Sequence, residues 1–156
     1  YTMTEFDLED GAVLLYADII TPGRTARGER FKYGLLSNKL EIRRNGIPIV
    51  CDHFRLEPGI DRAQMAGAFE KYTHMGNVWI VSEQCDKNTL EEVRQAIDPV
   101  SSQSDTILAG ASRLEGGGVV VRMLGNTVWE LQMLVKSIWD HVRVRLLHKP
   151  PHQVRK

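Results

Sequence analysis

Apolar and polar residues alternate in short runs up to about residue 57, a pattern that predicts β-strands. Residues 2–8 alternate from the start, and 13–20 is almost continuously apolar, as in strands that are covered on both faces. Further strands are predicted over 30–36, 39–44 and 47–50. We expect these strands to follow one another as a β-meander.

A tight hairpin is predicted at Asn45 and Gly46, which separate two of these apolar runs. Both residue types tolerate the positive φ that such a turn requires. Pro48 follows shortly afterwards and cannot donate a hydrogen bond to a neighbouring strand. It is therefore expected at a sheet edge or near the start of its strand.

The pattern changes after residue 58. Residues 63–72 fit a helix or a strand equally well, and 77–82 predicts a short apolar strand. Residues 106–114 and 119–124 flank three consecutive glycines, which predicts a second hairpin.

Two helices are predicted in this second part of the chain. Asn88 with Glu91 three residues later is typical of a helix start, and Pro99 predicts the end of that helix. Thr127 with Glu130 predicts a second start. One face of this second helix carries an apolar stripe that is expected to pack on a core, formed by Val128, Leu131, Val135, Ile138 and Val142.

The elements together predict a mainly β protein with two helices, of the α+β class. Its second half runs strand, helix, hairpin, helix. A length of 156 residues suits one domain that covers the whole chain. Because the alternation begins at Tyr1, we expect further residues upstream of this sequence.

Composition excludes several classes of protein. Twenty basic and twenty acidic residues give no net charge, which argues against a nucleic-acid-binding protein. No apolar run approaches the roughly 20 residues that span a bilayer, and the first residues do not resemble a signal peptide. Two cysteines, Cys51 and Cys85, are typical of a reducing compartment, so a cytoplasmic location is expected.

Asp18 is the most unusual acidic residue, because it interrupts an apolar strand. A buried carboxylate is costly unless it is paired or bound to a cation. Two explanations remain open: an ion pair with a nearby arginine, or an oxygen ligand that faces an internal passage.

The loop after the second predicted strand gathers glycines and charges, among them Arg24 and Glu29. A solvated turn or a loop that binds a partner or an anion would both fit. It is not a phosphate-binding loop, because it leads into a predicted strand and lacks the lysine of that motif.

Metal-binding and catalytic motifs are weak. Cys51, Asp52 and His53 are all residue types that bind metals. In a strand, however, Cys51 and His53 would face one side and Asp52 the other. His141 and His148 could share a helix face, but no thiol or carboxylate joins them in sequence. No catalytic signature is found, and we expect the chain not to be an enzyme.

One series of short motifs resembles the UreD family of urease accessory proteins, also called UreH. The series covers residues 18–56 in order: Asp18-Ile19-Ile20, Gly23-Arg24, Gly28-Glu29-x-Phe31, Gly34-x-Leu36-Ser37-Asn38-Lys39-Leu40-Glu41-Ile42, Gly46-x-Pro48 and Asp52-x-x-Arg55-Leu56. The resemblance is strong over 1–57 and continues more weakly through 106–124 and into the last helix. It identifies the chain as the C-terminal portion of a longer protein, whose additional region is rich in β-structure.

The resemblance implies a helically wound stack of sheets with two helices. It also implies a non-catalytic scaffold that assists nickel delivery to apo-urease, together with the accessory proteins UreF and UreG. Nickel would bind transiently, with no tightly bound cofactor, in an internal tunnel whose acidic positions match Asp18 and Asp52. Relatives place glutamate at the second position, and Ala17 replaces an aromatic residue. Arg24, Glu29 and Glu41 match further motif positions and are candidates for the tunnel or for partner binding.

Two other functions remain open from the residues alone. The chain could be a protein-interaction domain without a role in metal transfer. It could also be part of a hydrolase or transferase whose active site lies partly upstream.

Overall fold

The computed structural model describes residues 1–24, 27–58, 69–102 and 105–151. Over these ranges the secondary structure is mainly β with two helices, which confirms the α+β class predicted from sequence. The elements are, in chain order, β1 (Thr2–Leu8), β2 (Leu14–Ile20), β3 (Leu36–Arg44), β4 (Ile47–Leu56), β5 (His74–Val81), α2 (Lys87–Ser101), β6 (Ile107–Leu114), β7 (Gly118–Gly125) and α3 (Val128–Leu147).

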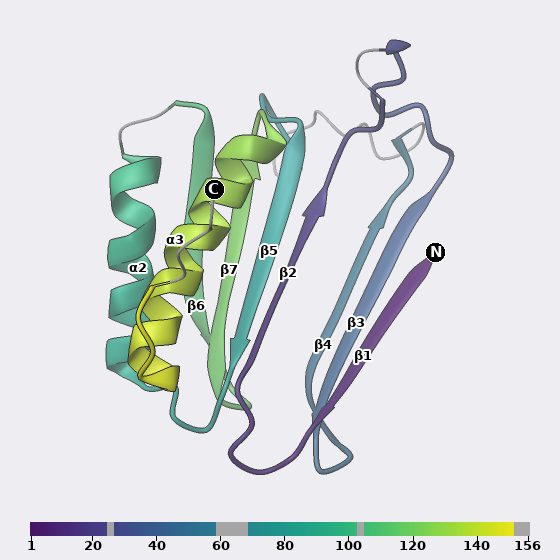
Figure 1. Cartoon of the computed structure of the whole chain (residues 1–156). Helices are drawn as coiled ribbons and strands as arrows, with labels where there is room; N and C mark the ends of the chain where they lie inside the picture. The colour runs from purple at the N-terminus through teal and green to yellow at the C-terminus, as the bar shows by residue number, and fades with distance from the viewer. Residues whose placement is uncertain (25–26, 59–68, 103–104, 152–156) are drawn as a thin grey trace.

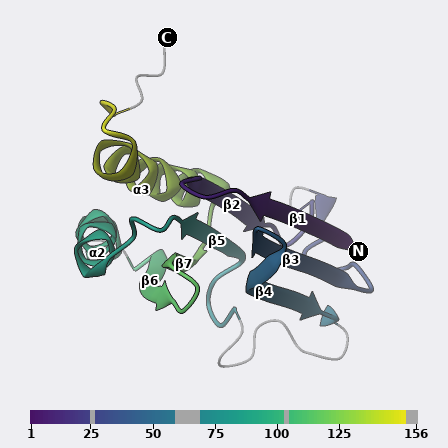
Figure 2. The same ribbon diagram turned by 90° about the horizontal axis from the view of Figure 1, so that it is seen from below.

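The strands form two sheets that face each other (Figure 1). The three-stranded sheet has the order β1-β3-β4, and the four-stranded sheet has the order β2-β5-β7-β6. Figure 2 shows α2 and α3 on one side of the four-stranded sheet and the three-stranded sheet on its other side. The chain therefore forms three layers, with the four-stranded sheet in the middle.

The predicted meander is wrong. β1 pairs in parallel with β3, while β2 crosses to the other sheet and pairs with β5. Alternation and turn residues mark where strands begin and end, but they do not determine which strands become neighbours. The continuous apolar run of β2 is explained by its place in the middle layer, where both faces of the strand meet other parts of the chain.

Within the three-stranded sheet, the Asn45-Gly46 hairpin is confirmed. It joins β3 to β4 with φ of 50° and 77° at its two residues, and Pro48 is the second residue of β4. The strand predicted over 30–36 is wrong. Phe31 has a φ of 51° and lies in a turn, so extended structure begins only at Leu36 and continues unbroken to Arg44.

The start and the end of α2 both differ from the prediction. The N-cap is Asp86 rather than Asn88, because the Asp86 carboxylate accepts a 2.8 Å hydrogen bond from the Thr89 N–H. The Thr89 hydroxyl in turn accepts one from the Asp86 N–H at 3.2 Å. The helix also continues through Pro99 to Ser101. Proline in the last turn removes one intrahelical hydrogen bond but keeps a helical φ.

The predicted start of α3 is confirmed, since the Thr127 side chain accepts a hydrogen bond from the Glu130 N–H. Leu131, Ile138 and Val142 are buried, as the apolar stripe predicts, while Val128 and Val135 are only partly buried. The buried face also includes Leu134 and Leu146, which were not predicted.

Three apolar clusters are found among the described residues. The largest lies between the helices and the four-stranded sheet, a second lies between the two sheets around Trp79 and Ile42, and a third surrounds Leu56 and Phe69. The β6–β7 turn approaches β4 so closely that a Cβ added to Gly116 would lie 2.7 Å from the Cβ of Ile49. The glycines of this turn therefore allow it to close over one end of the sandwich.

The remaining expectations of the sequence are met in part. Cys51 is exposed, Cys85 is buried, and neither thiol forms a disulfide. In the described ranges, no helix is long and apolar enough to cross a membrane. Most of the ambiguous segment 63–72 and the tail from 152 onward lie outside the described residues.

Candidate functional site

Asp18 and Asp52 come from different sheets and line the same small cavity. Asp18 lies on β2 and Asp52 on β4, and both border a space of about 60 Å³ between the sheets. Strand alternation explains this placement, because Ala17 and Ile19 pack toward the helices while Asp18 points the other way. Strand alternation alone does not indicate that the two carboxylates lie close together, because their proximity depends on how the two sheets stack.

Asp18 belongs to a row of polar residues that crosses three strands of the four-stranded sheet. It is the register partner of Asn77 on β5, which is in turn the register partner of Arg122 on β7. The Asn77 amide donates a 2.9 Å hydrogen bond to the Asp18 carboxylate and accepts one of 2.9 Å from the Arg122 guanidinium. Asn77 is only 1% exposed, so this side chain is held firmly by both contacts.

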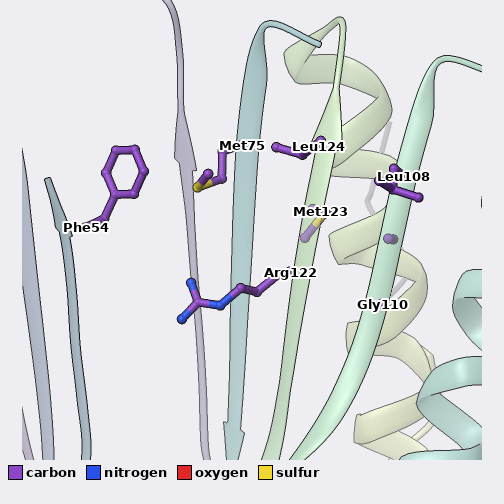
Figure 3. Close-up of a pocket in the computed structure, with 8 residues that line it drawn as sticks. Phe54, Met75, Leu108, Gly110, Arg122, Met123 and Leu124 are labelled. Carbon is purple, nitrogen blue, oxygen red and sulfur yellow. The ribbon is translucent and has the colours of Figure 1, made fainter. Parts of the chain in front are cut away.

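Arg122 connects this row to the opposite sheet. Its guanidinium forms an ion pair with the Asp52 carboxylate and lies 6.0 Å from the centre of the Trp79 ring. Figure 3 shows the side chain reaching from β7 across the face of β5. Asp18, Asn77, Arg122 and Asp52 thus form one continuous polar network between the sheets.

The environment disfavours a charged Asp18. Burial is the main cause that raises the pKa of its carboxyl, and the nearby charge of Asp52 acts in the same direction. The hydrogen bond from Asn77 and the positive charge of Arg122 oppose this shift. A cation that entered the cavity would offset the cost of keeping both carboxylates ionised.

The two explanations left open for Asp18 can now be compared with its contacts. Its direct partner is the neutral amide of Asn77, and Arg122 reaches it only through that amide. Asp52, rather than Asp18, forms the ion pair with an arginine.

A wider groove borders the network on the other side of Arg122. It holds about 560 Å³ and lies over the part of β6 and β7 beside the edge strand β4. We call it the β6–β7 groove; it is lined by Phe54, Met75, Leu108, Ala109, Gly110, Arg122, Met123 and Leu124 (Figure 3). Among the described residues of this lining Arg122 is the single charged one, and its ion pair with Asp52 connects the apolar groove to the polar network.

Arg24 and Glu29 lie outside this network. They form a 2.7 Å ion pair with each other in the loop after β2, with 67% and 39% of their side chains exposed. Gly23 begins this turn with a φ of 101°, and a Cβ there would lie 2.6 Å from the Glu29 carbonyl oxygen. The structure places this pair in a tightly folded surface turn.

Glu41 lies on the face of β3 opposite to the cavity. Its neighbours Leu40 and Ile42 are buried in the core between the sheets, so the Glu41 side chain points to the outer face. There it pairs with Arg43 at 2.5 Å and lies 3.9 Å from Lys39. The structure therefore does not bring Glu41 together with Asp18 and Asp52.

The remaining metal-ligand candidates are dispersed. Cys51 and His53 are exposed on the outer face of β4, and His53 forms a 3.0 Å hydrogen bond with Ser37. His141 bonds a main-chain carbonyl of its own helix, and His148 caps α3. Among the described residues, no group of three or more His, Cys, Asp or Glu side chains could hold a metal ion.

Sequence analysis missed Asn77 and Arg122, which complete the network. Both carry the signal that drew attention to Asp18, because each is a polar residue inside an otherwise apolar strand. The signal was available, but its meaning depended on the pairing of β2, β5 and β7.

Comparisons with known proteins agree on one family. The model of the family described as UreD urease accessory protein matches residues 2–156. A urease accessory protein UreD of Haloarcula marismortui is 31% identical over 96% of this chain and 49% of its own length. Proteins of the same name from Staphylococcus epidermidis and Bacillus sp. are 24% and 27% identical, over 97% and 94% of this chain. The chain spans about half the length of these relatives. The chain therefore belongs to the UreD family of urease accessory proteins.

Proposed function

We propose that this chain belongs to a non-catalytic urease maturation factor that assists the transfer of nickel to apo-urease, and that Asp18 and Asp52 lie on the path of the ion. The observation that carries the proposal is that these two carboxylates come from different sheets and line one cavity. Membership of the UreD family supports the link to urease. The maturation partners would be UreF, UreG and apo-urease, in the cytoplasm.

The chemistry of the cavity suits a site of passage rather than storage. Carboxylates and water bind a divalent ion less tightly than thiolates do, and they exchange more readily. The other oxygen-bearing side chains of the described lining, such as Thr2, Thr4 and Asn38, are neutral, so two carboxylates would hold an ion too weakly for permanent binding. A conducting site needs this balance, because the ion must be able to leave as well as enter. Nickel is cargo in this proposal, and no resident cofactor is required.

A second candidate is an interaction domain without a role in metal transfer. It is favoured by Trp129 and Met133, which lie one turn apart on α3 and are 69% and 47% exposed. Large exposed apolar side chains at this spacing are typical of a surface that contacts a partner. In this case Asp52 and Arg122 would serve only to join the two sheets.

Activation of apo-urease in vitro separates the two candidates. The reaction would contain the full-length protein, UreF, UreG, nickel, GTP and bicarbonate, and urease activity would be measured. Activation that needs this protein and is lost in Asp18→Asn/Asp52→Asn supports a role in nickel transfer. Activation that survives this double substitution, but fails when Trp129 and Met133 are replaced, supports the interaction domain.

A matched control uses acidic residues far from the cavity. Glu91 pairs with Arg94 on the surface of α2, and Glu115 is exposed in the β6–β7 turn. Glu91→Gln/Glu115→Gln removes the same number of charges and should activate urease like the unaltered protein.

A further inference from the structure

Arg122 already supplies a positive charge to the pair of carboxylates. Its guanidinium is paired with the Asp52 carboxylate and is hydrogen-bonded to the Asn77 amide, which itself holds Asp18. Arg122 thus neutralises Asp52 directly and is connected to Asp18 through one amide. Any cation that uses both carboxylates must compete with Arg122.

The contacts of Arg122 allow such competition. Its side chain is 52% exposed, and that of Asp52 is 22% exposed, so water reaches the ion pair. Ion pairs in contact with water are weak, because the solvent screens the charges and the long side chain loses freedom when it is held. Asn77 is different, since it is buried and its amide N–H bonds Asp18 without any contribution from Arg122.

Space for a displaced Arg122 lies directly beside it. Gly110 on β6 is the register partner of Arg122 on its other side, so the row Asp18–Asn77–Arg122 ends at a residue without a side chain. A Cβ added to Gly110 would meet no atom within 4 Å. The β6–β7 groove, which Arg122 already lines, opens at this point (Figure 3).

We propose that Arg122 is a gate that keeps the Asp18–Asp52 cavity closed to cations until a divalent ion displaces its side chain toward Gly110 and into the β6–β7 groove. This inference rests on the proposed function and adds a control of the same site. The gate also gives selectivity. A monovalent ion carries the same single charge as Arg122, so replacing Arg122 by it gains no electrostatic energy. A divalent ion carries two charges and can neutralise both carboxylates.

Direct titration of the full-length protein with Ni²⁺ tests the gate. Arg122→Gln keeps a polar side chain that can bond Asn77 but removes the competing charge. We expect Arg122→Gln to bind Ni²⁺ at least about tenfold more tightly than the unaltered protein, because a contacting arginine typically lowers the affinity of a carboxylate for a proton by about tenfold or more and should oppose a metal cation in the same direction. The gain should disappear in Asp18→Asn/Asp52→Asn/Arg122→Gln. Unchanged affinity in Arg122→Gln, or a gain that persists without the carboxylates, would overturn the proposal.

A second variant decides the question if Arg122→Gln does not fold. Gly110→Val adds a side chain where space is open and suits a strand. It should leave the melting temperature nearly unchanged, but it fills the place to which Arg122 would move, so Ni²⁺ affinity should fall. Equal Ni²⁺ affinity in Gly110→Val and the unaltered protein would contradict the gate.

The outcomes for the gate and for the proposed function are distinct. If Arg122→Gln binds Ni²⁺ more tightly but urease activation does not need Asp18 and Asp52, the gate stands and the role in nickel transfer falls. If activation needs both carboxylates while Arg122→Gln leaves Ni²⁺ affinity unchanged, the role in transfer stands and the gate falls.

Discussion

Asn77 faces Asp18 across β5 and β2, and its amide donates a 2.9 Å hydrogen bond to the Asp18 carboxylate. This contact explains how a carboxylate is accommodated in an apolar strand without a direct ion pair. Asp18 nevertheless lines the cavity that Asp52 also borders. Consequences for stability and for function follow from this pair.

Replacement of Asn77 should destabilise the fold through Asp18. Asn77→Leu would remove the donor and leave a largely buried carboxylate without its bond, at a cost of about 1–3 kcal/mol. Chemical denaturation of Asn77→Leu, Asp18→Leu and the double variant would measure the coupling. The double variant should be more stable than the sum of the single effects predicts, by about 0.5–3 kcal/mol. Additive effects would show that the hydrogen bond contributes little.

Stability should depend on pH through Asp18. Its pKa is raised above the ordinary value of 3.8, mainly by burial. A raised pKa in the folded state means that the unfolded state loses the proton first, so stability falls as pH rises from 3.8 through the folded-state pKa. Asp18→Asn removes this charge and should match or exceed the unaltered protein in melting temperature at neutral pH.

The difference between the two melting temperatures should shrink as the pH falls below 3.8, since Asp18 then becomes neutral in both the folded and the unfolded state. Melting curves over a pH series would measure it. A difference that favours the unaltered protein at neutral pH and vanishes in acid would indicate a lowered pKa instead, and a carboxylate stabilised by its surroundings.

Core positions of α3 should differ sharply from its surface. Ile138 is fully buried, and Ile138→Ala should cost about 2–5 kcal/mol of unfolding free energy. Val144 on the same helix is 51% exposed, and Val144→Ala should change stability by no more than about 0.5 kcal/mol. Similar losses for both variants would show that the packed face of α3 is assigned wrongly.

The start of α2 gives a test of the cap. Asp86→Ala should lower stability by about 0.5–2 kcal/mol, because the Thr89 N–H loses its acceptor. Asp86 also pairs with Arg145 of α3, so the loss should lie toward the upper end. Asn88→Ala is the matched control and should have little effect on thermal unfolding. A larger loss of stability in Asn88→Ala than in Asp86→Ala would show that Asn88 is the N-cap residue, as the sequence predicted.

Local features of this fold could be predicted from sequence, while the partners of its strands could not. Asn45-Gly46 and Thr127 form their turn and cap as predicted, because each depends on residues close in the chain. The parallel pairing of β1 with β3 depends on how the whole sheet assembles, and alternation carries no information about it. The strand predicted at 30–36 failed because its residues form a turn around Phe31.

The candidate site shows the same division. Asp18 stood out because a carboxylate interrupts an apolar strand, and the structure places it between the two sheets. Asp52 was first considered as part of the Cys51-Asp52-His53 group, and it was assigned to a path for nickel only through the resemblance to the UreD family. Arg122 and Asn77 gain their meaning from the register of β5 with β7, so residue types alone could not assign them a role.

The most direct test of the role of the two carboxylates is the nickel content of urease matured with Asp18→Asn/Asp52→Asn. Urease would be purified after maturation with this variant, with the unaltered protein or with Glu91→Gln/Glu115→Gln, and nickel per active site would be measured by atomic absorption. A parallel pull-down of UreF and a melting curve would confirm that the variant is folded and assembled. We predict a clear loss of nickel with the cavity variant alone, at unchanged partner binding. Full nickel content with this variant would contradict the account.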